Sequence, residues 1–456
     1  MSTNTSLGSG LKTRHLTMMG LGSAIGAGLF LGTGVGIRAA GPAVLLAYIV
    51  AGAIVVLVMQ MLGEMASARP SSGSFSTYGR QAFGHWAGFV LGWLYWFMLV
   101  MVMGAEMTGA AAIMGSWFGV DPWIPALVAV VFFAFVNFAK VRGFGEFEFW
   151  FSFIKVAVII GFLIVGVLLF FGLLPGSEPI LFSNVSEVEF APNGLPGIAA
   201  GLLAVAFAFG GIELVTIAAA ESDNPSQAIG TAVRSVIFRI IVFYLGSVLV
   251  IIMLVPYDQI QDASTAAESP FTQVLSLANL PGVVGFMEAV IVLALLSAFN
   301  AQIYGTSRLV HDLAREGDAP RIFKVTNRES VPINAVVLSM IFAFISVGLQ
   351  WWNPTGLLTF LLNAVGGCLI VIWIMTTASF LKLRPAIEAA GETPSVRMWG
   401  YPWLSWVTMA LLLGLVALML FDEAARSQII SVVVVTGVLA ILSLTTKNNK
   451  KRKITT

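Results

Sequence analysis

The sequence predicts an all-α membrane protein of twelve transmembrane helices, two of which are interrupted near the middle of the bilayer. Of its 456 residues, 58% are hydrophobic and 10% are charged, against about 25% charged residues in soluble domains. Apolar stretches of about 20 residues, the length that crosses a bilayer as a helix, recur along the whole chain. Two of these stretches contain closely spaced glycines, which destabilise a helix interior.

Twelve apolar segments emerge when the chain is searched for stretches of that length. Pro-Gly pairs at 175–176 and 281–282 mark longer connections between them. Residues 74–84, after the second segment, predict a short amphipathic helix on the membrane surface. The segments are 17–37, 42–62, 87–114, 122–139, 149–173, 196–220, 235–255, 282–306, 332–350, 354–381, 401–421 and 427–445.

These segments form one transmembrane domain, residues 17–445, between an N-terminal tail of residues 1–16 and a basic tail of residues 446–456. Almost all of the 24 basic residues fall in connections on one side of the predicted membrane. By the positive-inside rule, that side is the cytoplasm, so both termini are predicted to be cytoplasmic. The N-terminus lacks the features of a cleaved signal peptide, so the first segment is predicted to be retained.

The first and sixth apolar segments carry the interruptions. Seven glycines lie between Gly20 and Gly36, and Gly210-Gly211 precedes Glu213. Close helix packing at small-xxx-small spacing is the alternative interpretation, although it requires fewer glycines. Non-helical backbone at membrane depth occurs only where it is buried in protein or lines a cavity. Matching interruptions in two halves of a membrane protein therefore indicate the substrate site of a secondary transporter.

The interrupted segments are five apart, so they cross the bilayer in opposite directions. This spacing predicts two inverted repeats of five helices, repeat one over about 17–173 and repeat two over about 196–381. The last two helices, over 401–445, lie outside the repeats. The prediction depends on the positions of the interruptions and on helix count, because the two halves show no clear residue-level repeat.

A helix that restarts after an interruption exposes unpaired N–H groups and a positive dipole end, which can bind an anion. Carbonyls freed at the other half-helix can accept hydrogen bonds from an ammonium, so a zwitterionic amino acid is the predicted substrate class. Small and aromatic residues, Phe30 among them, are expected to line the pocket. The predicted substrate-binding residues are Ser23, Ala24, Ile25, Gly26, Ala27, Gly28, Met103, Met107, Phe207, Phe209, Gly210 and Gly211.

Four ionisable residues lie within or at the edge of predicted spans, where a charge is energetically costly and suggests function. Glu106 and Lys155 are the predicted proton-coupling residues. Lys155 could instead extend its ammonium to the cytoplasmic surface, and Glu106 could be a polar packing residue. Glu213 could complement the dipole of a half-helix, and Glu288 could face the outer water.

Other chemistries find no support in the sequence. Three scattered histidines and the single Cys368 offer no metal, haem or catalytic cluster. No phosphate-binding loop or nucleotide motif occurs. We therefore expect no cofactor, no enzymatic activity and no nucleic-acid partner, with transport driven by an ion or substrate gradient.

Several motifs resemble the amino acid–polyamine–organocation superfamily and, within it, the amino acid transporter family. The run from Phe149 to Lys155, together with Glu106, is most similar to bacterial aromatic amino acid permeases. The resemblance covers nearly the whole chain. It implies a LeuT-like fold with proton-coupled symport of phenylalanine, tyrosine and tryptophan across the plasma (cell inner) membrane. The motifs, in order, are 22–30, 207–213, 221–225, 307–309 and 314–320.

The resemblance also implies roles for individual residues. Lys155 corresponds to a lysine near the place where sodium sits in sodium-coupled relatives, and sodium-site positions fall near Ser297 and Asn300. Ala27 replaces a threonine that is frequent in close aromatic permeases, so a side-chain contribution at that position is in doubt. Expected partners are the amino acid, protons and the lipid bilayer, with no obligate protein partner.

Three other functions stay open at this point. A permease for other neutral amino acids, or an amino acid exchanger, would use the same fold. An ion channel is the alternative from a different class, although the sequence shows no filter repeat or rings of charge.

Overall fold

The computed structural model describes Met18, Gly22 and most residues from Ile25 to Arg452. Throughout this part of the chain the regular structure is helical and no strand occurs, which confirms the predicted all-α class. The positions outside this description are 1–17, 19–21, 23–24, 72, 139–143, 187, 212, 215, 217–218, 220–221, 223, 261–268, 328–330, 353, 355, 422 and 453–456.

Each predicted apolar segment contains at least one helix. Among the described residues, eight helical stretches are long and apolar enough to cross a membrane, and three further apolar helices are shorter. The elements are α2 (Ala27–Phe30), α3 (Gly32–Ala40), η1 (Gly41–Ala43), α4 (Val44–Ala68), α5 (Phe75–Phe83), α6 (His85–Phe118), α7 (Trp123–Phe138), α8 (Phe144–Phe170), α9 (Ser183–Ser186), α10 (Gly194–Ala208), α12 (Pro225–Arg239), η3 (Ile240–Leu245), α13 (Gly246–Leu254), η4 (Tyr257–Gln259), α14 (Pro270–Ser276), α15 (Val283–Glu316), η6 (Arg321–Lys324), α16 (Ile333–Trp352), α17 (Leu357–Ala389), α18 (Trp403–Met419) and α19 (Glu423–Arg452).

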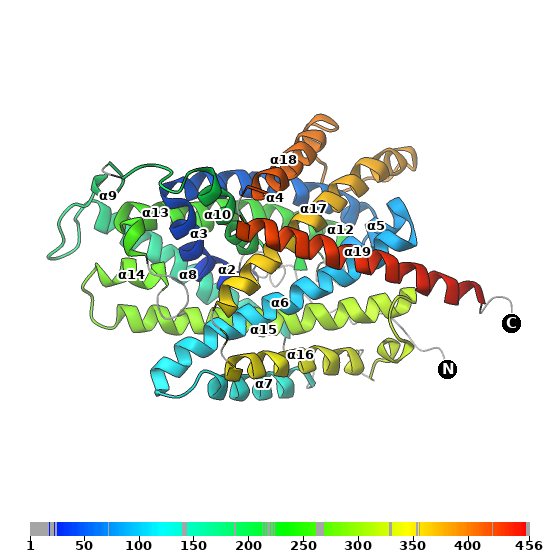
Figure 1. Ribbon diagram of the computed structural model, residues 1–456, viewed down its shortest axis with the longest axis horizontal. Coiled ribbons are helices and arrows are strands. Elements are labelled where there is room, and N and C mark those ends of the chain that lie inside the picture. The colour runs from blue at the N-terminus through cyan, green and yellow to red at the C-terminus, as the bar shows by residue number, and fades with distance from the viewer. Residues whose placement is uncertain are drawn as a thin grey trace.

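Two helices of 34 residues, α6 and α15, pack along each other through the middle of the molecule (Figure 1). Glycines permit their close approach: a Cβ at Gly109 of α6 would lie 3.0 Å from a methyl carbon of Leu295 on α15. The paired helices α7 and α16 lie beside them, and α17 crosses α6. The predicted amphipathic helix is present as α5, packed against α6 and α17.

The structure interrupts the first and sixth segments at the predicted glycines. Backbone at Ile25 and Gly26 is not helical, and α2 begins at Ala27. In the sixth segment α10 ends at Ala208, and Gly211 in the following turn has a φ of +84°, a conformation that favours glycine. Since α10 packs against both α2 and α3, the two interrupted regions are neighbours.

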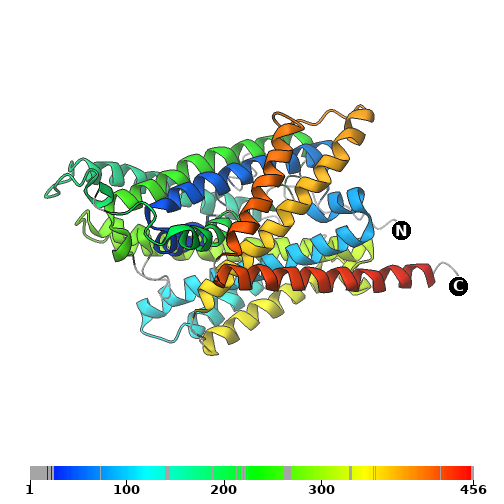
Figure 2. The ribbon, with the colours of Figure 1, turned by 45° about the horizontal axis from the view of Figure 1, so that its top comes forward.

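The last two helices cover one side of the molecule. Figure 2 shows α18 and α19 on its exterior, where α18 contacts α4, α10 and α17. Their outward faces carry exposed apolar side chains, including Trp403 and Ile441. A polar solvent would disfavour such a surface, whereas lipid would stabilise it.

A buried ion pair joins α4 to α17 at one end of the bundle. Arg384 donates from Nε to Glu64 Oε1 and from Nη1 to Glu64 Oε2, both at 2.8 Å. Glu64 Oε2 also accepts from the Met398 amide at 2.6 Å. Only 1% of the Glu64 side chain and 9% of the Arg384 side chain are exposed, so water can replace neither partner.

Glu64→Gln should destabilise the protein by about 2 kcal/mol, because the buried Arg384 guanidinium loses its buried carboxylate and keeps Glu388, 2.8 Å away, whose side chain is 57% exposed. Thermal unfolding in detergent measures the effect. The matched control is Glu392→Gln, whose partner Arg69 lies 3.0 Å away with both side chains about 30% exposed, and which should change stability by less than about 1 kcal/mol. Equal losses of thermal stability in both variants would contradict the importance of burial.

Candidate functional site

The two interrupted regions come into direct contact at Gly28. A Cβ on Gly28 would lie 2.6 Å from Cα of Ala208, and backbone cannot yield as a flexible side chain can. Glycine at this position is therefore required for α2 to approach the end of α10. The small-residue packing interpretation thus holds for Gly28, alongside the interruption at Ile25 and Gly26.

The first amide of α2 is bonded by a carboxylate of the protein itself. Ala27 N–H donates to Glu106 Oε2 at 2.9 Å, and both residues are buried. Gly26 makes room for this contact, since a Cβ there would overlap the Glu106 carboxylate. An anion at this helix start was expected from the dipole. In this structure Glu106 of α6 occupies that place, and an external carboxylate would have to displace it.

Lys155 is completely buried and does not extend to the surface. Its ammonium donates to the carbonyl oxygen of Gly22 at 3.2 Å, just before the first interruption. The charge of Lys155 is balanced by two nearby carboxylates, Glu148 and Glu106. The snorkelling alternative is therefore wrong for this structure, and Lys155 and Glu106 bracket the non-helical backbone around Ile25.

Glu148 is a buried residue that the sequence analysis missed. Its side chain has 0% exposure, and Ser297 of α15 donates from Oγ to Glu148 Oε2 at 3.2 Å. The apolar window of the fifth segment began at residue 149, which placed Glu148 in a connection. A usable signal was its seven-residue spacing from Lys155, because that spacing places both side chains on one helix face.

Glu213 lies beside the second interruption and is 2% exposed. The Gly211 amide donates to Glu213 Oε1 at 3.4 Å, the dipole-complementing arrangement considered as one of its roles. Arg239 lies near enough to balance the Glu213 charge. The Arg239 side chain is itself wholly buried, at the end of α12 and directly before the π-helix η3.

Comparison with known proteins assigns the family. A family model described as "Amino acid permease" matches residues 15–455. The chain belongs to this family. The permease is 72% identical to "Aromatic amino acid transport protein AroP" of Corynebacterium glutamicum, over 98% of this chain and 97% of that protein. It is 39% identical to "Gamma-aminobutyric acid permease" of Bacillus subtilis, over 96% and 94% of the two chains. The aromatic transport protein of Escherichia coli K12 is 34% identical, over 90% and 89%.

Two aromatic residues of the permease flank the second interruption. Phe207 and Phe209 are 2% and 1% exposed. The Phe209 ring lies 5.1 Å from that of Tyr244 and 6.0 Å from that of Tyr48. A Cβ on Gly210 would lie 3.4 Å from side-chain atoms of α17, so α17 covers the interruption on another side.

Met103 and Met107 belong to a different buried cluster from Phe207 and Phe209. Both methionines are fully buried in a second cluster that contains Phe133 of α7 and Phe299 of α15. They therefore face the α7–α16 side of α6, while the two phenylalanines belong to the main core. The structure does not bring these two parts of the predicted pocket wall together.

The remaining predicted site residues have separate environments. Glu288 accepts a hydrogen bond from Trp117 Nε1 at 2.8 Å in an exposed position. Asn300 accepts from Asn137 Nδ2 of α7 at 2.8 Å, whereas Ser297 bonds Glu148 of α8. Ser23 and Ala24 lie outside the described residues. Within the described part of the chain, no group of three histidine, cysteine or acidic residues could hold a metal ion.

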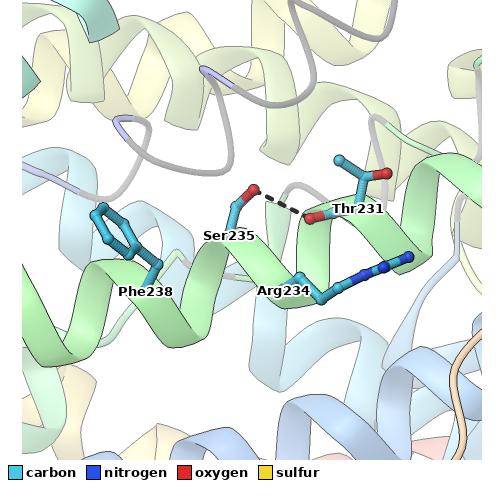
Figure 3. Close-up of a pocket in the computed structure, with 4 residues that line it drawn as sticks. All are labelled: Thr231, Arg234, Ser235 and Phe238. Carbon is cyan, nitrogen blue, oxygen red and sulfur yellow. Dashed lines mark hydrogen bonds between the residues drawn. The ribbon is translucent and has the colours of Figure 1, made fainter.

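A surface hollow of about 420 Å³ lies away from these residues, along one face of α12 (Figure 3). Thr231, Arg234, Ser235 and Phe238 line it, and the Ser235 hydroxyl donates to the Thr231 carbonyl at 3.0 Å. Among the described residues, none of the predicted substrate-binding or proton-coupling residues lines this hollow. The candidate site is the buried region between the interrupted helices, where Glu106 and Lys155 bond the first interrupted segment.

Gly26→Ala should abolish transport while the protein still inserts, because the added methyl group overlaps the Glu106 carboxylate and breaks its bond to the Ala27 amide. Uptake of radiolabelled amino acid by cells, normalised to membrane expression, measures the effect. Gly161→Ala on α8 is the control, since a Cβ there meets nothing within 4 Å, and it should transport normally. Normal transport by Gly26→Ala would exclude a tight contact at this position.

Proposed function

We propose that this permease imports phenylalanine, tyrosine and tryptophan together with protons by alternating access. The observation that carries the proposal is the 72% identity to an aromatic amino acid transport protein over nearly all of both chains. Membership in a family of transport proteins agrees with the expectation that the chain is not an enzyme. Both termini are proposed to be cytoplasmic in the cell inner membrane, as the positions of the basic residues favour.

The proposed architecture has twelve spans arranged as two inverted repeats of five, with α18 and α19 added outside them. Support comes from the helices found in every predicted apolar segment and from the two interruptions five segments apart. The peripheral position of α18 and α19 agrees with a role outside the repeats. In such transporters, the substrate site lies between the repeats near the bilayer midplane.

The proposed substrate-binding site lies at the N-terminal end of α2. An amino acid carboxylate would compete with Glu106 for the Ala27 amide, since both are anions seeking the same positive helix end. Carbonyls of the interrupted backbone would accept hydrogen bonds from the substrate ammonium. Phe209, with the neighbouring Tyr48 and Tyr244 rings, would pack against an aromatic side chain through edge or offset contacts.

This competition supplies a mechanism for proton coupling. A protonated Glu106 is a much weaker acceptor than its carboxylate, so proton binding frees the Ala27 amide for the substrate carboxylate. Substrate and proton then bind cooperatively, and each favours the other by the same free energy. Lys155, bonded to Gly22 on the other side of the interruption, would respond to the same change of charge.

Uptake into proteoliposomes with all twenty amino acids and γ-aminobutyrate tests the substrate class. The aromatic amino acids should compete best, and an inside-alkaline gradient of one pH unit should raise their accumulation by up to about tenfold, the limit that one coupled proton sets. γ-Aminobutyrate is included because permeases named for it are 39–40% identical to this chain. Preference for γ-aminobutyrate, or exchange without proton entry, would refute the proposal.

Glu106→Gln should retain binding of the aromatic amino acid but make it independent of pH, because glutamine resembles the protonated acid. Accumulation driven by a pH gradient should fall by up to about tenfold for the same reason. Binding is measured in detergent across pH 5 to 8, and accumulation in proteoliposomes. Glu288→Gln, at the exposed Trp117 contact, is the control and should behave as wild type. An unchanged pH dependence in Glu106→Gln would assign the proton to another group.

A further inference from the structure

One face of α8 carries polar residues into the protein interior. Glu148, Ser152 and Lys155 each have 0% exposure, and Ile159 and Phe162 continue the same face. Spacings of four and three residues place all five side chains in one stripe along the helix. The opposite face is apolar and exposed. Because membrane helices direct ionisable groups toward protein or water, this stripe places Glu148 and Lys155 in one buried environment.

Glu148 needs a positive partner in this environment. A carboxylate removed from water is destabilised unless a charge and hydrogen bonds compensate it. Ser297 supplies the hydrogen bonds, at 3.4 and 3.2 Å to the two oxygens. Lys155, buried on the same face of α8, supplies a positive charge that acts on Glu148, and Glu148 and Glu106 are the negative charges that act on Lys155. Opposite charges therefore lie seven residues apart on one buried face of α8.

The two carboxylates that share Lys155 are attached to different parts of the fold. Glu106 of α6 bonds Ala27, within the interrupted first segment. Glu148 bonds Ser297, within the long central helix α15. Lys155 itself contacts the interrupted segment through Gly22. Any displacement of that segment would break the Gly22 and Ala27 contacts and leave Glu148 and Ser297 in place.

We propose that Glu148 is a positioning residue of the transport cycle, the fixed counter-ion that keeps Lys155 charged and buried on the α15 side while Glu106 gains and loses the transported proton. The inference rests on the proposed proton coupling and adds a residue to it. With Glu106 protonated, Lys155 and Glu148 form a neutral pair, which a low-dielectric interior tolerates. Without Glu148, protonating Glu106 would leave an unpaired buried ammonium.

Other charged groups also face this cluster and enter the pH dependence. From η3 and the residue before it, Tyr244 and Arg239 act on Glu106 and Lys155. Arg239 in turn interacts with Glu213 beside the second interruption. These groups are common to the wild type and to the variants below, so a difference between the proteins reports on Glu148 alone.

The decisive measurement is the pH profile of aromatic amino acid uptake by Glu148→Gln in proteoliposomes. Half-maximal uptake should move to lower pH by about one unit, because Glu106 is harder to protonate once Lys155 lacks its second counter-ion. For comparison, a single charge at a distance of about 10 Å produces a shift of that size at an effective dielectric constant of about 20. Glu148→Asp keeps the charge and should restore the wild-type profile. Glu146→Gln, two residues earlier on α8 and partly exposed, is the matched control.

Each outcome decides the role of Glu148. If Glu148→Gln fails to fold, the double variant Glu148→Gln/Lys155→Met, which removes both charges, should restore folding. A double variant that is equally unstable would overturn the proposal in favour of packing. If uptake by the wild type depends on pH but the pH profile of Glu148→Gln is the same as that of the wild type, the proposed role of Glu148 is overturned and the proposed proton coupling is not. Uptake by the wild type that ignores pH would refute the proposed coupling and this inference with it.

Discussion

The bilayer requires that every interrupted helix find partners for its backbone within the protein, and the centre of this permease is built around that requirement. Where the first segment stops being helical, the Ala27 amide is bonded by a side chain, and the Gly22 carbonyl accepts both from the Ile25 amide, at 3.1 Å, and from a side chain. Glu106 bonds the amide and Lys155 bonds the carbonyl. Burying a charge and burying an unpaired backbone group each cost free energy, and the hydrogen bonds between them offset part of both costs.

These charges also connect parts of the fold that are distant in the sequence. Three carboxylates, Glu106, Glu148 and Glu213, share the buried interior with Lys155 and Arg239. The partners of each charge belong to different helices, so moving one interrupted segment changes the balance for the others. A proton or an incoming carboxylate alters the same balance. In the proposed mechanism, binding and conformational change would therefore be linked by electrostatics rather than by a separate relay.

The surrounding helices provide the fixed frame against which such movement can occur. The α6–α15 pair supplies both Glu106 and Ser297. Asp318, just after α15, forms ion pairs with Arg80 of α5 and with His85, the first residue of α6. The Glu64–Arg384 ion pair joins α4 to α17. Buried ionic contacts of this kind hold helices in one register because a misplaced charge would remain unpaired.

The sequence by itself determined the membrane class, the apolar segments and the two interruptions, because hydrophobic length and glycine content act locally along the chain. It also singled out Glu106 and Lys155 as charges at membrane depth. Only the tertiary structure decided their partners, since Ala27 and Glu106 are 79 residues apart and Gly22 and Lys155 are 133 apart. It likewise turned Met103 and Met107 away from Phe209, and it buried Glu148, which lies just outside the predicted fifth segment. Which side chains come into contact depends on how helices far apart in the sequence pack together, and no local sequence pattern encodes that packing.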